Sequence, residues 1–514
     1  MVCTDLGFRT RRLVHRAVKL VVIHQELARG FAVSDTEMHW WSTTETAQRI
    51  AAKEVSSREV LEHMVDRADR LDGQINAIIQ RDLDRARAAA DAADTALAAG
   101  QPLGPLHGVP MTVKDSFQTE GCITTSGAPE LAGFVPSEDA DPVARVRDAG
   151  AVIWGKTNMP IWAGDIQSYN EVYGTTLNPF NPDRTCGGSS GGSAASLAMG
   201  FTSLEIGSDI GGSIRVPAHY SGVVGHKPSF GIVPSQGQIP GMPGTFSQAD
   251  IAVTGPMARH VEDLELAMGI LTGPDRWNAP GWRVDLPAPR QESASDLRVA
   301  GWIDDDAYPV DGDTKRVLTD LVHTLTGAGV SVDTGARPGF TLEKAVDVFQ
   351  RLLYAALSGG HPREKLDHMA ADSSDTPLGY VKRNTAMRHR DWLSNHERRL
   401  QIRKQWEEFF HDFDIMLMPV QPRDAIEHDH SEPQFDRVVM IDGVQRPYTD
   451  LFTWVGPSGV AFLPSTVVPV GMSSAGLPIG VQIVAPYLED RTALHFAKLV
   501  SALCGGCPRP AAAG

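Results

Sequence analysis

Residues 185–228 decide the fold of this chain. They read TCGGSSGGSAASLAMG from Thr185 to Gly200 and IGSDIGGSIRVPAHYSGVVGHKP from Ile206 to Pro228. Two glycine pairs each lead directly into a serine, at Ser189 and Ser213. Glycine lets the backbone approach another group closely, and a serine hydroxyl behind such a turn can act as a nucleophile beside backbone N–H groups. We therefore predict two loops that meet at one site.

A flexible linker is the alternative interpretation, because Gly/Ser-rich runs usually have that role. The sequence that follows argues against it. Ala194–Met199 is small and suited to a helix, and a linker seldom opens directly into a packed helix. Around Ser213, apolar residues alternate with glycine, which favours a buried turn over a solvated one.

Three ordered motifs make the chain resemble the amidase signature family of serine hydrolases. GGSSGGS is present at Gly187–Ser193, GSDIGGSIRVP at Gly207–Pro217, and the lysine motif VPMTVKD at Val109–Asp115. The resemblance runs from about Thr43 to about Leu503. It implies an α/β fold, in which a central mixed sheet is covered by helices on both faces and a helical region forms a cap.

One motif separates branches of that family. Gly225–Ser229 reads GHKPS and Ile232–Pro234 reads IVP, which is more similar to fatty-acid-amide-hydrolase-2-type members. The A-type chain of tRNA-dependent amidotransferases usually reads GLKPT and then SLDQxGP, where this chain has FSQADIAVTGP at Phe246–Pro256. Such an amidotransferase component, which works with a partner and tRNA, stays the alternative to a stand-alone amidase.

Composition limits the class of protein. Of 514 residues, 42% are hydrophobic and 21% charged, as in ordinary soluble globular proteins. The net charge of −16 argues against sequence-independent binding to nucleic acid or to an anionic membrane. No stretch reaches the roughly 18 apolar residues of a membrane span. The few cysteines fit a reducing compartment. We expect a cytoplasmic monomer or homodimer without nucleic-acid partner or stable membrane insertion.

The chain is expected to form a single amidase domain over residues 38–505. Residues 1–37 lie outside the resemblance and form either an N-terminal extension, which could be disordered, or an over-extended start, since Met38 precedes the first family-like helix. Residues 344–411 read as charged helices and are expected to form the cap or the substrate-side wall, and residues 506–514 a tail. Cys504 and Cys507 have metal or redox spacing, but the sequence contains no convincing set of metal ligands.

Hydrophobic periodicity predicts alternating helices and strands. Ser56 and Glu59 mark the start of a helix, and the motif around Lys114 reads as a turn followed by a strand that ends near the lysine. The other expected strands are 151–154, 297–302, 330–332 and 413–419 with a hairpin at 466–470 and 476–484, and the expected helices include 84–99, 141–149, 196–199, 313–328, 388–410 and 492–503.

The resemblance assigns three catalytic roles. Ser213 is the nucleophile, Ser189 the bridging serine and Lys114 the base. A lysine is a base only when it is neutral, and burial favours that form because desolvation penalises the charge. In the family the bridging serine follows a cis peptide bond, which is Gly188–Ser189 here, and it passes the proton between nucleophile and lysine and later to the leaving amine. No metal or other cofactor is expected.

The resemblance also names supporting residues. Backbone N–H groups of Ile210, Gly211, Gly212 and Ser213 are expected to form the oxyanion hole. Asp209 and Arg215 are expected to hold this loop by hydrogen bonds, although a purely structural ion pair explains them equally well. The further supporting residues are Gly188, Ser190, Ser193 and Asp115.

The substrate pocket is predicted from apolar and aromatic residues near the motifs. They are Met159, Trp162, Tyr169, Phe452 and Trp454, and each could also be part of the core. Such a pocket favours a small or apolar amide, an aryl amide, an ester or a carbamate (urethane).

Two other functions stay open. GGSSG at Gly187–Gly191 matches the G-x-S-x-G nucleophile elbow of α/β-hydrolases, which would make Ser189 the nucleophile. That fold needs a downstream histidine, and His219 and His226 follow too closely. The other function is that of a catalytically inactive binding protein. The intact Lys114, Ser189 and Ser213 argue against it.

These alternatives predict different sites of covalent labelling. A fluorophosphonate should form its adduct on Ser213, because this serine follows the glycine pair of the second motif. Peptide mass mapping locates the adduct. An adduct on Ser189 would contradict the assignment and favour the nucleophile elbow.

Overall fold

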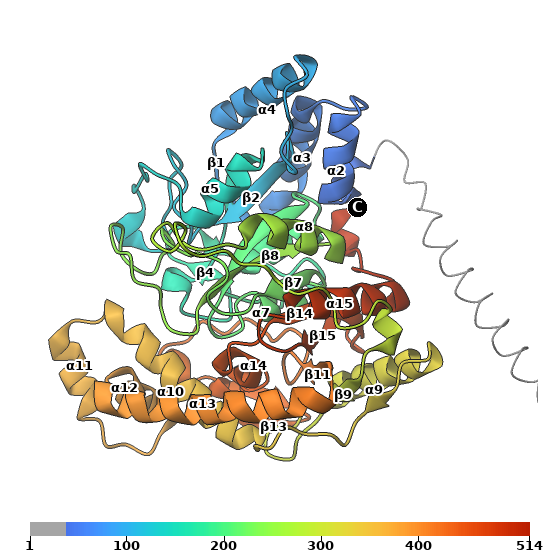
Figure 1. The fold of residues 1–514 in the computed structure, drawn as a ribbon. Coiled ribbons are helices and arrows are strands. Elements are labelled where there is room, and N and C mark those ends of the chain that lie inside the picture. The colour runs from blue at the N-terminus through green and yellow to red at the C-terminus, as the bar shows by residue number, and fades with distance from the viewer. Residues whose placement is uncertain (1–36) are drawn as a thin grey trace, which may run out of the picture.

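Two β-sheets form the framework of the computed structural model, which describes residues 37–514 (Figure 1). The extension expected at residues 1–37 lies, apart from Glu37, outside the described residues. The larger sheet has eight strands in the order β10-β9-β11-β15-β14-β7-β8-β6, and the smaller has three in the order β1-β3-β2. The chain therefore has a mixed α/β architecture, as predicted.

The large sheet is mostly antiparallel. Only β9 pairs in parallel, with β10 on one side and β11 on the other. The expected hairpin is present, since β14 and β15 pair antiparallel. Its strands are β6 (Leu204–Asp209), β7 (Val224–Lys227), β8 (Val253–Ala258), β9 (Val299–Gly301), β10 (Val332–Asp333), β11 (Ile415–Pro419), β14 (Ser465–Met472) and β15 (Pro478–Val484).

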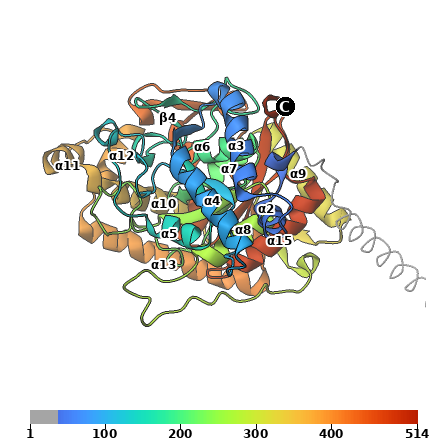
Figure 2. The same cartoon turned by 90° about the horizontal axis from the view of Figure 1, so that it is seen from above.

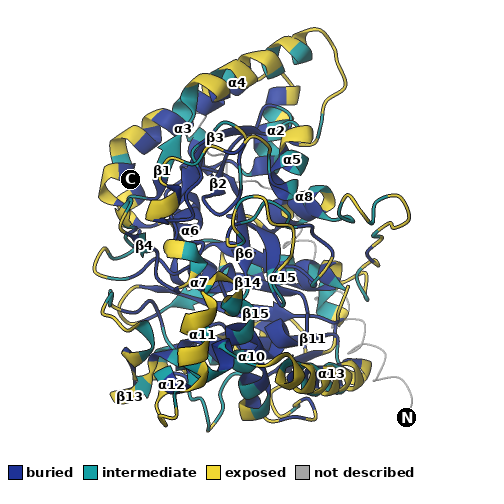
Figure 3. Cartoon of the chain, turned by 90° about the vertical axis from the view of Figure 1, so that its left-hand side faces the viewer, coloured by how far each residue is buried: buried dark blue, intermediate teal, exposed yellow. Residues whose placement is uncertain are grey.

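Helices cover both faces of this sheet, because its strands alternate between two hydrophobic clusters. Met416 and Met418 of β11 belong to one cluster, and Ile415 and Leu417 to the other. The first cluster includes α6 (Gly191–Ala198), α7 (Arg215–Tyr220), α10 (Leu342–Ala356), α13 (His389–Asp412) and α14 (Gly456–Val460), and the second α5 (Asp141–Asp148), α8 (Val261–Leu271), α9 (Gly312–Gly327) and α15 (Asp490–Cys504). Apart from β10 at the edge, the strands of this sheet are mostly buried, whereas α11 and α13 keep exposed faces (Figure 3).

The small sheet belongs to the N-terminal part of the chain. It consists of β1 (Ile78–Arg81), β2 (Pro110–Lys114) and β3 (Val152–Thr157), and β3 pairs in parallel with β2 and antiparallel with β1. Helices α2 (Thr43–Ala51), α3 (Ser57–Leu71) and α4 (Leu83–Ala98) pack nearby, and α4 lies in front of the sheets when seen from above (Figure 2). The predicted start of α3 is confirmed by a capping box between Ser56 and Glu59.

An edge strand of each sheet lies beside an edge strand of the other. β2 ends the small sheet and β6 ends the large one, and the two strands are in contact. Side chains connect them: the hydroxyl of Thr112 on β2 donates to the buried carboxyl group of Glu205 on β6. The site therefore forms at the boundary of two sheets, which the sequence did not predict.

Residues 342–412 are mainly helical and form the lower part of Figure 1. α10 and α13 are joined there by α11 (Arg363–Ala370) and α12 (Pro377–Thr385). Their role as a cap or substrate-side wall stays a prediction. No helix in residues 37–514 is long and apolar enough to cross a membrane.

The C-terminal residues pack against the N-terminal helices. The guanidinium of Arg67 on α3 donates to the carbonyl of Ala513 at 2.5 Å, and Arg509 stacks over the ring of Trp40 at 4.5 Å. The C-terminus consequently lies close to α2 (Figure 1).

Helix α6 begins five residues earlier than the predicted helix at 196–199. Gly191 and Gly192 form its first turn, so the second half of the Gly/Ser run is helical and buried. A Cβ at Gly192 would lie 2.4 Å from the backbone nitrogen and 2.6 Å from the oxygen of Asn158. Close packing requires these glycines, and the linker interpretation is wrong.

This packing predicts the effect of adding one methyl group. Gly192→Ala should lower the free energy of unfolding by about 1–3 kcal/mol, because the backbone at Asn158 must move. Gly269→Ala is the matched control in α8, where nothing lies within 4 Å of the new Cβ. It should stabilise by about 0.5–1 kcal/mol through helix propensity. Urea unfolding measures both, and equal stabilities would contradict the packing argument.

Candidate active site

Lys114, the last residue of β2, is fully buried. Its ammonium donates to the hydroxyl of Ser189 at 2.7 Å and to that of Ser208 at 3.0 Å. Burial lowers the pKa of Lys114 from 10.5 to about 7, while the carboxyl groups of Asp209 and Glu205 act in the opposite direction. Lys114 is thus available in its neutral form near neutral pH.

Ser189 is held by close packing of the chain on both sides of it. The peptide bond between Gly188 and Ser189 is cis, and Gly187 has a φ of +90°, which favours glycine. A Cβ at Gly188 would lie 2.7 Å from the carbonyl carbon of Ile166. Ser168 donates to the carbonyl of Gly187 at 2.9 Å. The bridging position is therefore fixed by backbone contacts.

Ser213 follows β6 on a second loop that meets the first. The N–H of Ser190 donates to the carbonyl of Ser213 at 3.1 Å, so the two glycine loops are joined as predicted. Residue Ser213 is 6% exposed, whereas Ser189 is completely enclosed. Of the two serines, only Ser213 has surface that is accessible from outside the protein.

Backbone N–H groups surround Ser213. Within residues 37–514, those of Ile210, Gly211 and Ser213 make no hydrogen bond, so they are available to an oxyanion. The N–H of Gly212 differs, because it donates to Asp209 at 2.9 Å. Of the four N–H groups expected to form the oxyanion hole, that of Gly212 is therefore already used within the loop.

Asp209 and Arg215 form a fully buried ion pair at 2.9 Å. Burial by itself would raise the pKa of Asp209, but the charge and hydrogen bonds of Arg215 lower it to about 2. Arg215 also donates to Val455, Ser458 and Gln482 at 2.8–3.2 Å. The pair therefore anchors the Ser213 loop to α14 and β15.

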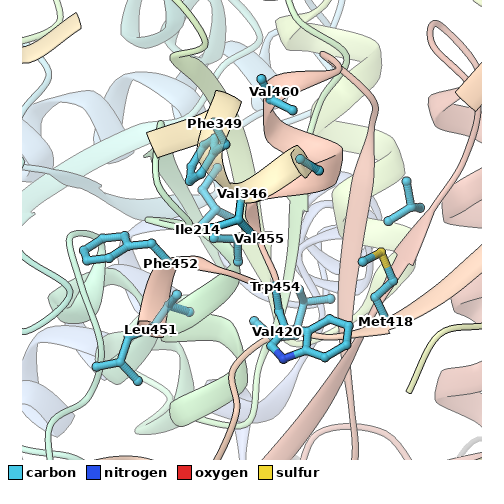
Figure 4. Close-up of a cluster of buried hydrophobic side chains, with 14 of the residues drawn as sticks. Ile214, Val346, Phe349, Met418, Val420, Leu451, Phe452, Trp454, Val455 and Val460 are labelled. Carbon is cyan, nitrogen blue, oxygen red and sulfur yellow. The ribbon is translucent and has the colours of Figure 1, made fainter. Parts of the chain in front are cut away.

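Apolar side chains border the Ser213 loop. Phe452 and Leu353 lie 3.4 and 3.6 Å from the position of a Cβ at Gly211, and Val455 lies 3.2 Å from that at Gly212. Phe452 and Val455 belong to a buried cluster with Val346 and Phe349 of α10 (Figure 4). Phe452 is consequently placed beside the site.

The other predicted pocket residues have different surroundings. Trp454 is 1% exposed and lies edge-on to Trp302 at 6.3 Å, so it is part of the core. Met159 is buried beside the hydroxyl of Ser126, and Trp162 is half-buried. The ring of Tyr169 stacks on His430 at 3.7 Å, and its hydroxyl donates to Asp165.

The histidines near the motifs bond elsewhere. His107 contacts the carbonyl of Ala93, His219 the carbonyl of Arg423, and His226 the hydroxyl of Thr466 and the carboxylate of Asp490. A nucleophile elbow would need a histidine beside Ser189, where the structure has Lys114.

Two residues of the site were missed by sequence reasoning. Ser208 holds the Lys114 ammonium, and its position in the GSD part of the second motif was the available signal. Burial raises the pKa of Glu205 to about 8, so this carboxyl group is neutral at pH 7. A single acidic residue in an otherwise uncharged strand segment, Leu204–Ser208, was its signal. In the described part of the chain, no cluster of His, Cys, Asp or Glu is arranged to hold a metal ion.

Comparison with known proteins identifies the family of this chain. The model of the family described as Amidase matches residues 59–494. The chain belongs to the amidase signature family. It is accordingly a hydrolase that acts on carbon–nitrogen bonds.

Individual relatives of this amidase differ in their activities. It is 34% identical to the A-type chain of the glutamyl-tRNA(Gln) amidotransferase of Anaeromyxobacter sp. (strain K), over 91% of this chain and 96% of the relative. It is 29% identical to fatty-acid amide hydrolase 2-B of Danio rerio, over 91% and 90%. The structure of a bacterial aryl acylamidase superposes with a TM-score of 0.77 at 25% identity, covering 91% and 96%.

Because Lys114 is buried, we predict that the free energy of unfolding depends on pH. Between pH 10.5 and 7 the unfolded lysine holds a proton that the folded one lacks, so lowering the pH favours unfolding. The stability of Lys114→Met relative to the wild type should therefore rise as pH falls from 9 to 7, by at most about 1.4 kcal/mol per pH unit. Urea unfolding at several pH values measures this difference.

Lys404→Met is the control, because Lys404 is 74% exposed on α13. The change in stability between pH 9 and pH 7 is compared for the two variants. An equal change for Lys114→Met and Lys404→Met would mean that Lys114 stays protonated in the folded enzyme.

Proposed function

We propose that this amidase hydrolyses the carbon–nitrogen bond of an apolar amide through an acyl-enzyme on Ser213, without a cofactor. Lys114 is the base and Ser189 relays protons between it and Ser213. The observation that carries the proposal is the enclosed Lys114 ammonium, 2.7 Å from Ser189, with its pKa lowered to about 7.

Acylation requires two coupled proton transfers. Neutral Lys114 accepts the proton of Ser189 while Ser189 accepts that of Ser213, whose oxygen attacks the substrate carbonyl. When the tetrahedral intermediate collapses, the same groups return a proton to the leaving nitrogen, and the carbon–nitrogen bond breaks. Water then hydrolyses the acyl-enzyme by the same route, which frees the acid and restores Ser213.

The loop before Ser213 supplies the electrostatic stabilisation of the reaction intermediate. In this proposal the N–H groups of Ile210, Gly211 and Ser213, which have no partner among the described residues, stabilise the oxyanion. Removing one such donor typically costs about 3 kcal/mol. Asp209 contributes indirectly, because it holds the N–H of Gly212 and the side chain of Arg215. Its carboxylate fixes the loop shape around the nucleophile.

The side chains beside Gly211 support an apolar or aryl substrate. Phe452 and Leu353 offer no charge to a substrate there, and Leu353 comes from α10, which supports the role of residues 344–411 as the substrate-side wall. Esters and carbamates pass through similar oxyanion intermediates and are included in this class.

A role as the A-type component of a tRNA-dependent amidotransferase is the second candidate, favoured by the 34% identity to such a component. The two functions are separated by testing the purified chain alone. Turnover of anilides and fatty amides without a partner supports the stand-alone amidase. Turnover of glutamine only, and only with partner proteins and tRNA, would support the second candidate.

Replacing the base should affect amides more than esters. Lys114→Ala should lower kcat/KM for an anilide by on the order of 10²–10⁴-fold. It should lower kcat/KM less for a matched phenyl ester, because a phenoxide leaves with less help from an acid than an amine does. In the wild type, activity should fall as pH drops below about 7, where Lys114 becomes protonated. Steady-state kinetics on both substrates measures the ratio.

Lys156→Ala is the matched control for that experiment. Lys156 is equally buried, burial lowers its pKa, and its ammonium donates to Phe117 and Thr124 and not to a serine of the site. Its loss should reduce stability without changing the amide-to-ester ratio. Near-wild-type anilide turnover by folded Lys114→Ala would remove Lys114 from the mechanism.

A further inference from the structure

A buried polar cluster lies behind the Ser189 loop. Its centre is the ion pair between Asp165 and Arg437, 2.6 Å apart, with side chains 6% and 0% exposed. The hydroxyl of Tyr448 donates to the second carboxylate oxygen of Asp165 at 2.7 Å, and Gln167 donates to that hydroxyl at 3.0 Å. We call these four residues the Asp165 cluster. It joins segments that are almost 300 residues apart in sequence.

One side of the cluster is in contact with the bridging serine's loop. The backbone of Asp165, Ile166 and Gln167 lies 2.7–2.8 Å from the position of a Cβ at Gly188, the residue before Ser189. Any shift of Asp165 therefore moves the wall against which this loop packs. The next residue, Ser168, continues the contact by bonding to Gly187 and Gly191.

The other side of the cluster leads to the apolar wall of the site. Tyr448 is the first residue of the short helix η8 (Tyr448–Phe452), and Phe452 at its end lies beside Gly211. The rings of Tyr448 and Phe452 are edge-on at 6.5 Å. The hydroxyl of Tyr448 thus connects the position of Phe452 to that of the Asp165 carboxylate.

The third contact of the cluster is made by Arg437, which lies beside a hairpin without any catalytic motif. Arg437 lies immediately before β12 (Val438–Ile441), which pairs with β13 (Val444–Pro447). Its guanidinium also donates to the hydroxyl of Tyr169 at 2.8 Å and to the carbonyl of Ser431 at 2.6 Å. Burial would lower the pKa of Arg437, but the adjacent Asp165 carboxylate raises it above its usual value.

From these contacts we propose that the Asp165 cluster positions Ser189 and Phe452 together, so that Asp165, Arg437 and Tyr448 are positioning residues for hydrolysis. The proposal rests on the proposed function, in which Ser189 relays protons for Ser213. Proton relay depends on sub-ångström geometry, and a displacement of about 1 Å can cost on the order of a hundredfold in rate. A cluster that only stabilised the fold would leave the rate of the folded enzyme unchanged.

The test uses two substitutions with different severity. Tyr448→Phe removes one hydrogen bond and leaves the ion pair in place, whereas Asp165→Asn removes the charge that pairs with Arg437. The second-order rate of Ser213 labelling by a fluorophosphonate, kcat and KM are measured at 25 °C on full-length protein whose folding is verified by urea unfolding. Tyr448→Phe should slow labelling and lower kcat by about tenfold, and raise KM, because Phe452 shifts with η8. Asp165→Asn should lower kcat by on the order of a hundredfold.

Matched controls come from polar contacts outside the site and outside residues 344–411. The buried carboxylate of Asp414 pairs with Arg298 at 2.7 Å and with Arg290 at 3.0 Å, and the hydroxyl of Tyr487 donates to the carbonyl of Phe230 at 3.0 Å. Tyr487→Phe and Asp414→Asn should change stability but leave labelling and kcat within about twofold of the wild type.

Each outcome decides between the two proposals. Wild-type labelling at Ser213 together with folded Tyr448→Phe at the wild-type rate and KM would overturn the positioning role alone. Absence of labelling at Ser213 in the wild type would overturn the proposed function, and this inference with it. If Asp165→Asn does not fold, Tyr448→Phe decides by itself.

Discussion

The site depends on one unfavourable placement, an amino group enclosed between two sheets. Lys114 is completely buried at the end of β2, with two hydroxyl groups as its partners, and desolvation lowers its pKa to about 7. In water the same lysine would be protonated at neutral pH and could not act as a base. The surrounding structure keeps this residue enclosed, and the polar groups of both serine loops are arranged around it.

Two carboxyl groups near Lys114 are kept in different states. Asp209 is paired with Arg215, which lowers its pKa to about 2 and leaves a fixed negative charge that shapes the Ser213 loop. Glu205 accepts a hydrogen bond from Thr112, but burial raises its pKa to about 8. Both carboxyl groups act to raise the pKa of Lys114, and burial of its ammonium outweighs them.

Glycine makes the enclosure possible. Gly188, Gly191 and Gly192 each leave no room for a Cβ, because backbone or side-chain atoms of neighbouring segments lie within 2.8 Å of that position. The absence of side chains at these positions lets the Ser189 loop pack directly against residues 158–168. Burial of this kind strengthens charge interactions, including those on which the base depends.

The sequence by itself determined the residues that carry chemistry and the elements that present them. The order of the motifs around Lys114, Ser189 and Ser213, the α/β class and the β14–β15 hairpin could be predicted, since they depend on local patterns and turn residues. Only the tertiary structure decided that β2 and β6 belong to different sheets, that the N–H of Gly212 is used by Asp209, and that Trp454 is core while Phe452 borders the site. It also revealed the Asp165 cluster. These features arise from contacts between segments that are distant in the chain, and no local pattern encodes which buried edges and charges will meet.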